Sequence, residues 1–295
     1  MILDFLPLWA VHISDGVLYW PVWLAGFLML VVFVAIGLRS LAVESWKSTE
    51  DPITWTALLT AAFFVATLIH VKLGPTSAHL LLNGLVGLIL GRRACLAIPV
   101  GIALQAFLLG HGGLSTIGIN SCIMILPALL ARPLYRYCHQ SLAVGLKEMG
   151  LAVVCLLFPA AFALVPAATA LSRLLGRWLN QGIDFVSGFL VGSVTVLMTA
   201  ALTGAVLARG GEEDWTAVAI LLVAAHLPLA VVEGVIIGFT CSFLAKVRPH
   251  LLPGHDSPAT QSCENEAFFD AANSSALIPA EKLPQAALPT DLSPR

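Results

Sequence analysis

The sequence predicts an all-α membrane protein, a polytopic bundle of about seven transmembrane helices followed by a disordered C-terminal tail. Of its 295 residues, 58% are hydrophobic and only 11% are charged, whereas soluble domains carry about 25% charged residues. Apolar runs of nearly twenty residues recur, which is the length a helix needs to cross about 30 Å of hydrocarbon. The net charge of −2 gives no general attraction to nucleic acid. Membrane lipid is therefore the expected surrounding, and nucleic acid is excluded as a partner.

The expected spans follow one another along most of the chain. They lie near residues 20–40, 53–71, 77–91, 95–110, 115–137, 184–208 and 215–247. The last stretch is longer than one perpendicular helix requires and contains Pro228, which predicts a kink or a tilt. Another apolar stretch, 149–172, is interrupted by Pro159 and Pro166. It fits an extra span, a hairpin or an interfacial segment.

Loop charges predict the orientation. Basic residues follow the first, third, fifth and last spans, and they are Arg39, Lys47, Arg92, Arg93, Arg132, Arg136, Lys147, Lys246 and Arg248. Cytoplasmic loops are enriched in lysine and arginine, so seven spans with the N-terminus outside bring all four groups to the cytoplasm. Residues 251–295 hold six of the 17 prolines among polar residues, a composition that does not order itself. We therefore expect an N-terminal extension at 1–10, a membrane domain at 11–250 and a disordered cytoplasmic tail at 251–295.

Two patterns concern the packing of the last helices. His226 and Glu233 are seven residues apart, hence on one helix face, where they fit a structural pair, the lining of a path or a contact with a partner. Glycines spaced by four let helix backbones approach closely, either within the bundle or at a docking face for a partner helix. These glycines are Gly87/Gly91, Gly188/Gly192 and Gly234/Gly238.

Four of the eight histidines fall at one membrane face in the seven-span topology. They are His12, His70, His79 and His111. Polar groups at membrane depth usually face a cavity or a partner, and imidazole suits nickel, cobalt, copper and zinc. The group therefore fits either transition-metal capture or histidines tolerated at an interface. Solvated positions explain His139, His250 and His255.

A turn at Gly74 and Pro75 precedes the third span. Thr76 or Ser77 fits the N-cap of the following helix. This cap would set His79 in the first helical turn, with Asn83 one turn further on the same face.

Four ordered stretches resemble one family. Residues 11–16 read Val-His-Ile-Ser-Asp-Gly, close to Met-His-Ile-Pro-Asp-Gly, and residues 74–79 read Gly-Pro-Thr-Ser-Ala-His, close to Gly-Gly-Thr-Ser-Gly-His. The other two are Gln105-Ala106-Phe107 with Gly110-His111-Gly112-Gly113-Leu114 and Gly118-Ile119-Asn120, and the last helix at 225–249 with its His-x-Pro and Glu-Gly. In these respects the chain is similar to the CbiM/NikM family, the substrate-binding membrane components (S components) of energy-coupling-factor (ECF) cobalt and nickel transporters.

The resemblance implies a metal site at the chain terminus. In the family, the terminal amine, the second residue's backbone nitrogen and imidazole, and the histidine of the Thr-Ser-x-His turn bind the metal. Carried over, His12 and His79 are ligands and Val11 supplies the amine, while His70, Asn83 and His111 are further candidates for the pocket. Here His12 is twelfth rather than second. Val11 is the true start through a GTG codon, or residues 1–10 are cleaved off, or the extension stays and the site is built differently.

The implied function is capture of Co²⁺ or Ni²⁺ at the outer face of the bacterial inner membrane. The metal is then the transported substrate, and no cofactor is expected. The chain carries no GxxxxGK[ST] phosphate-binding loop, so the resemblance implies separate ATPase subunits and an ECF coupling subunit in the membrane. A solitary metal permease or metal sensor is the alternative. A third possibility, an intramembrane enzyme, is disfavoured because the sequence contains no nucleophile–base motif, no HExxH motif and no pair of intramembrane aspartates.

Overall fold

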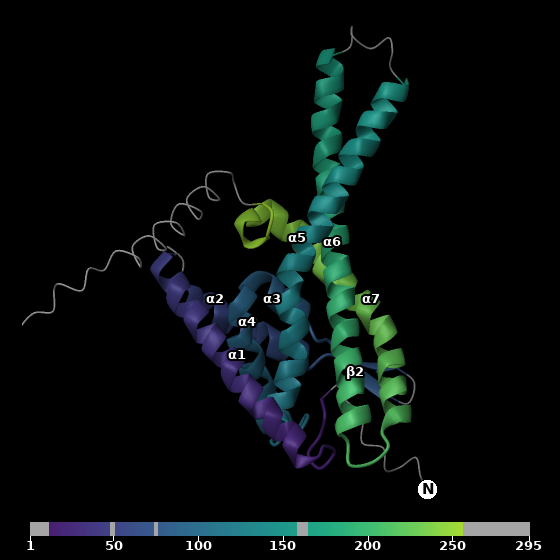
Figure 1. Cartoon of the computed structure of the whole chain (residues 1–295). Helices are drawn as coiled ribbons and strands as arrows, with labels where there is room; N and C mark the ends of the chain where they lie inside the picture. The colour runs from purple at the N-terminus through teal and green to yellow at the C-terminus, as the bar shows by residue number, and fades with distance from the viewer. Residues whose placement is uncertain (1–11, 48–50, 74–75, 158–164, 256–295) are drawn as a thin grey trace, which may run out of the picture. The chain divides into compact units, whose positions relative to one another are not determined.

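The computed structural model describes residues 12–47, 51–73, 76–157 and 165–255 (Figure 1). Its elements in chain order are α1 (Trp20–Lys47), α2 (Pro52–Ala66), β1 (His70–Leu73), β2 (Thr76–His79), α3 (Asn83–Leu90), η2 (Gly91–Arg93), α4 (Ala94–Leu109), α5 (Ile117–Leu157), α6 (Val165–Gly210), α7 (Thr216–Val247) and η4 (Pro249–Leu251). The secondary structure of the described residues is therefore helical apart from one short hairpin, as the composition predicts. Val11, the extension at 1–10 and the tail from 256 onward lie outside the described residues.

Five described stretches are long and apolar enough to cross a membrane. They are Trp20–Ser45, Asn83–Leu109, Ile117–Leu142, Gly182–Gly210 and Thr216–Val247, and α2 is a shorter apolar helix. Seven spans are thus not shown. The chain nevertheless reverses between α3 and α4, because His79, just before α3, and Gln105, near the end of α4, both lie beside His12. The chain is a multi-pass membrane protein.

The two longest helices cover part of residues 149–172. Helix α5 has 41 residues and α6 has 46, which correspond to about 60 and 70 Å at 1.5 Å per residue. Each is about twice as long as the hydrocarbon core is thick. Because α5 continues to Leu157 and α6 begins at Val165, the described part of 149–172 agrees with a helical hairpin.

Several of the basic side chains gather at one end of the helices, called the basic end below. Arg93 Nε lies 2.8 Å from Glu44 Oε2, which joins η2 to the last turns of α1. Arg93 also donates a hydrogen bond of 2.7 Å to the Pro52 carbonyl at the start of α2. Arg132 of α5 donates one of 2.9 Å to the Leu88 carbonyl near the end of α3. Which end faces the cytoplasm stays a prediction.

Helices α6 and α7 pack backbone against backbone along the glycines that the sequence singled out. A Cβ atom on Gly192 would lie 2.9 Å from the Glu233 carbonyl oxygen, and one on Gly188 would lie 2.9 Å from that of Ile237. On the other helix, a Cβ atom on Gly234 would lie 2.9 Å from the Phe189 carbonyl oxygen. Real Cβ atoms do not come this close to backbone, so the spacing serves packing within the bundle.

The ordered chain continues past the predicted start of the tail. Leu252 is 1% exposed and packs in a cluster with Tyr135 and Cys241. His255 makes a hydrogen bond to Asp184 of α6. Residues 251–255, assigned to the tail from composition, therefore belong to the packed part, because one leucine and one histidine anchor them.

Candidate metal centre

His12 and His79 lie face to face in the interior. Their ring centroids are 5.1 Å apart, with an angle of 26° between the ring planes. His12 is 6% exposed and His79 is 1% exposed. His12 comes from the segment before α1 and His79 from the last position of β2. The fold thus brings two distant histidines, both predicted as ligands, into one buried site.

The tautomer of His79 and a buried nitrogen of His12 suit both rings to metal ligation. His79 Nδ1 lies 3.1 Å from the Leu80 carbonyl oxygen. A carbonyl only accepts, so Nδ1 carries the proton and Nε2 carries the lone pair. His12 Nε2 is buried and has no hydrogen-bond partner among the residues that the structure describes, and the same holds for both amide atoms of Gln105. Buried polar atoms nearly always have a partner, and a transition-metal ion is one that imidazole suits.

The site also keeps His12 neutral. Burial, with a smaller contribution from the nearby His111, lowers the pKa of His12 to about 4, and the polar contact with the side chain of Gln105 offsets only part of this change. Near neutral pH the ring therefore carries no proton that a metal ion would have to displace.

Asn120 of α5 holds the backbone beside His12. Its side-chain oxygen accepts a hydrogen bond of 3.0 Å from Ile13 N, and its nitrogen donates one of 3.0 Å to Ile13 O. The hydroxyl of Thr116 donates a second hydrogen bond, of 2.6 Å, to Ile13 O. These contacts provide hydrogen-bond partners for the buried backbone N–H and C=O of Ile13, and they thereby fix the position of the neighbouring His12.

Asp15 ties the same segment to the turn before α5. Its carboxylate accepts hydrogen bonds from Leu114 N at 3.0 Å, from Ser115 N at 2.8 Å and from the Ser115 hydroxyl. Burial raises the pKa of Asp15, but the hydrogen bonds from Ser115 and Leu114 outweigh it and lower the pKa below its usual value. Asp15 therefore stays ionised and pins residues 12–15 to the 110–116 turn.

Gly113 leaves the space that Asp15 occupies. A Cβ atom on Gly113 would overlap the Asp15 carboxylate and backbone nitrogen. We expect Gly113→Ala to lower the free energy of unfolding by about 1–3 kcal/mol, as overpacking does. Thermal unfolding of the purified protein checks this, with Gly182→Ala as the control because no atom lies within 4 Å of its Cβ position. Equal stability of the two variants would contradict the packing described.

Glu233 of α7 fixes the turn that follows His79. Its Oε1 accepts a hydrogen bond from Leu81 N, and its Oε2 accepts one of 3.0 Å from Leu82 N. Glu233 is fully buried. Leu82 has a φ of 45°, a left-handed conformation that costs energy for a leucine and needs support from its surroundings. The carboxylate holds this turn in place.

The predicted helix cap before His79 is therefore wrong. His79 ends strand β2, which pairs antiparallel with β1, and the helix starts only at Asn83. Thr76 and Ser77 belong to that strand and do not cap a helix, because their backbone pairs with β1. Glu233 binds the backbone nitrogens of Leu81 and Leu82 between the strand and the helix. Glu233 also forms no pair with His226, whose Nδ1 lies 2.6 Å from Leu222 O.

The remaining candidates have different places. His111 lies close enough to His12 to affect its charge. Asn83 is fully buried, and its amide donates to Thr199 Oγ1 at 2.8 Å and to Met124 O at 3.3 Å, which joins α3 to α6 and α5. The backbone of His70 is paired with that of His79, whereas its side chain lies outside the described part. Val11 lies outside it altogether. Asn120 and Glu233, not predicted as site residues, lie within stretches that resemble the family.

Comparison with known proteins identifies the family. The family model CbiM, described as the cobalt uptake substrate-specific transmembrane region, matches residues 12–172 and 140–251. A Haemophilus influenzae protein, whose name assigns it provisionally to metal transport, is 32% identical over 82% of this chain and 96% of its own length. A Methanocorpusculum labreanum protein, provisionally named a fused cobalt transport protein CbiMQ, is 23% identical over 83% of this chain and 37% of its own length. The crystal structure of a transition metal transporter has the same fold, with a TM-score of 0.55, 20% identity and coverage of 80% of this chain and 93% of that one. The chain therefore belongs to the CbiM family, the transmembrane components of cobalt uptake.

Proposed function

We propose that the chain captures Co²⁺ or Ni²⁺ at the outer face of the membrane, with the imidazoles of His12 and His79 as ligands. The observation that carries this proposal is the buried pair itself. Two stacked histidines and an amide, Gln105, meet where His12 Nε2 and the amide atoms lack a hydrogen-bond partner within the described chain. First-row divalent ions bind such nitrogen donors well, and burial excludes competing water.

The orientation is part of the same proposal. The histidine pair lies beside the segment before α1 and the turn between α4 and α5, whereas Arg93 and Arg132 mark the basic end. Cytoplasmic loops are enriched in such residues. The histidine pair therefore faces outside and the basic end faces the cytoplasm.

Energy for import comes from other subunits in this proposal. A coupling subunit in the membrane and separate ATPase subunits drive the release of the metal inside. The longer CbiMQ relative supports this arrangement, because this chain matches only 37% of its length. Cellular Co²⁺ uptake, measured with an inactivated ATPase subunit, should stop. Uptake that continues would favour a solitary permease.

The third donor is the backbone amine of residue 11. An amine has a pKa near 8 and loses its proton on binding metal far more easily than an amide. We expect a chain starting at residue 11 to bind Ni²⁺ at least about tenfold more tightly than a chain that keeps residues 1–10. Both chains keep the two imidazoles, but only the shorter chain has a free amine at residue 11.

Titration calorimetry on the two purified proteins checks this. Mass spectrometry must first establish the N-terminus of each protein. As the control, acetylation of the amine at residue 11 should reduce the affinity to that of the longer chain. Equal affinities for all three forms would mean that the amine of residue 11 is not a ligand and that the site uses another donor.

A further inference from the structure

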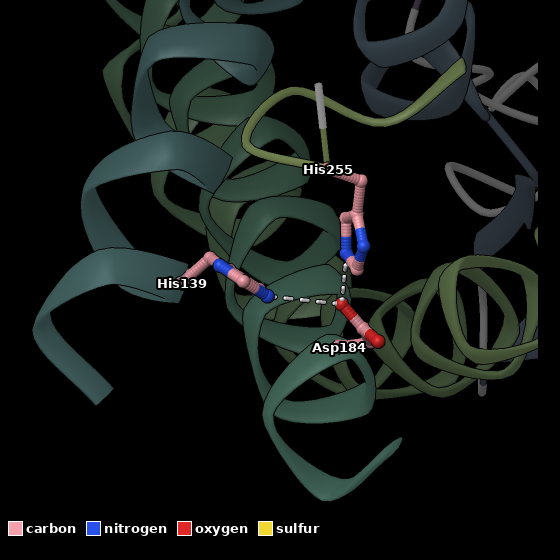
Figure 2. A group of neighbouring side chains, drawn as sticks. All are labelled: His139, Asp184 and His255. Atoms are coloured by element: carbon pink, nitrogen blue, oxygen red, sulfur yellow. Dashed lines mark hydrogen bonds and ion pairs between the residues drawn. The ribbon is translucent and has the colours of Figure 1, made fainter. Parts of the chain in front are cut away.

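A second cluster of ligand-type side chains lies apart from the histidine pair. His139 of α5, Asp184 of α6 and His255, which follows η4, point toward one another (Figure 2). His255 Nε2 lies 2.9 Å and His139 Nε2 lies 3.3 Å from the same atom, Asp184 Oδ1. One potential ligand atom from each residue lies within 4.8 Å of the others. The sequence alone assigned both histidines to solvent.

Asp184 is the unusual member of this cluster. It is 2% exposed and lies within a span, where a carboxylate is costly unless it has strong partners. Tyr135 donates a hydrogen bond of 2.8 Å to the same Oδ1 atom. The partners described for this carboxylate are thus one phenol and two imidazoles, and imidazoles carry a positive charge only when protonated. A divalent cation would compensate the buried charge fully.

The cluster lies far from the site of His12. Helix α5 begins at Ile117, next to Thr116, which contacts the backbone of Ile13. The stretch from Ile117 to His139 is about 33 Å long at 1.5 Å per residue, close to the thickness of the hydrocarbon core. Gly254 and His139 are neighbours, so the cluster joins the end of the packed chain to α5.

We propose that His139, Asp184 and His255 form a second site for a divalent first-row transition-metal ion. Two imidazoles and one carboxylate are an established donor set for such ions, which leaves further coordination positions for water. This site goes beyond the proposed function, because it lies outside the capture site and needs none of its residues.

The geometry requires only small movements. Zinc binds imidazole nitrogen and carboxylate oxygen at about 2.0–2.2 Å, so neighbouring ligand atoms lie about 3 Å apart around the ion. The two contacts to Asp184 Oδ1, at 2.9 and 3.3 Å, already have this spacing. The imidazole rings, with centroids 4.9 Å apart, must turn so that both Nε2 atoms face one point. The side chains of His139 and His255 are 17% and 20% exposed, which gives an ion a way in.

Metal binding here would fasten the C-terminal segment. His255 follows η4 and is the last described residue. An ion shared with α5 and α6 would hold residues 248–255 against both helices. The site therefore couples the local metal concentration at the basic end to the ordering of the segment that leads into the tail.

Metal binding by the full-length protein tests the proposal. The protein carries His12→Ala and His79→Ala to remove the capture site, is stripped with chelator, and is dialysed against Zn²⁺, Co²⁺ or Ni²⁺. We expect this protein to retain one bound ion per chain. Adding His139→Ala or His255→Ala should weaken binding at least about tenfold, as loss of a ligand does. His250→Ala is the matched control, since His250 is exposed in η4 and outside the cluster.

A second readout separates a metal site from a structural role. Hydrogen exchange over residues 248–255 should slow when metal is added, and this response should vanish in Asp184→Asn, which keeps the shape of the side chain but removes its charge. No ion bound after removal of the capture site would overturn the proposal, as would identical affinities in the His139, His255 and His250 variants. The cluster would then be a hydrogen-bonded latch only. Ion binding at His12 and His79 is measured separately in the His139→Ala/His255→Ala protein, so failure of one site is distinguishable from failure of the other.

Discussion

Replacing His12 or His79 by alanine is expected to weaken the binding of Co²⁺ and Ni²⁺ by at least about 100-fold, or about 2.7 kcal/mol. Each substitution removes one of two buried imidazoles whose rings face each other at 5.1 Å. Without one imidazole, too few nitrogen donors remain to replace the water that surrounds a free ion. Titration calorimetry measures the loss, in a protein that also carries His139→Ala and His255→Ala so that one site is observed.

The control for this experiment is a histidine of the same chain that lies outside both sites. His250→Ala should leave the affinity unchanged, because His250 is exposed in η4. Thermal unfolding should show that the His12 and His79 variants remain folded. Variants that are folded and bind either ion like the parent would remove these residues from the capture site.

Substitution of Glu233 by glutamine is expected to weaken the same metal binding by about tenfold to 100-fold without touching a ligand, as changes to groups that orient ligands do. The carboxylate accepts hydrogen bonds from both Leu81 N and Leu82 N. A glutamine has one accepting oxygen, so its amide nitrogen would face a backbone N–H. The turn loosens, and His79, two residues before Leu81, loses its fixed position.

Hydrogen exchange gives the readout that a general loss of stability would not produce. The amides of Leu81 and Leu82 should exchange faster in Glu233→Gln, while amides elsewhere in α7 should exchange as in the parent. Thr240→Val is the matched control on the same helix, because Thr240 donates its hydrogen bond of 2.8 Å to Ile236 O within α7. A lower melting temperature with unchanged metal affinity would assign Glu233 to stability alone.

The sequence predicts the helical class and the capture histidines for different reasons. Composition and apolar run length predict the class, because a helix satisfies all its backbone hydrogen bonds within one segment, as a chain in hydrocarbon requires. The expected topology groups His12 and His79 with two other histidines at one membrane face, and the resemblance to family stretches singles these two out as ligands. The hairpin at 70–79 was missed because Thr76 and Ser77 are good helix caps locally, and tertiary contacts decided otherwise. Glu233 is about 150 residues from the turn that it holds.

Long-range partners explain the rest of what the sequence did not reveal. Asn120 hydrogen-bonds to the backbone of Ile13, which lies 107 positions away in the sequence. A contact to backbone atoms does not depend on the type of side chain, so no sequence pattern indicates it. His139 and His255 have polar neighbours in sequence that suit solvated residues, yet both meet the buried carboxylate of Asp184. A pattern along the chain indicates which residues could act as ligands. The packing of α5, α6 and α7 decides which of them meet.

X-ray absorption spectroscopy of the Co²⁺-loaded protein tests most directly whether His12 and His79 bind the metal. The sample carries His139→Ala and His255→Ala so that the ion occupies the capture site. We expect a nitrogen shell with the multiple scattering of two imidazole rings, and the loss of one ring in either the His12→Ala or the His79→Ala protein. A spectrum without imidazole scattering, or one that is identical in all three proteins, would contradict the assignment of these two ligands.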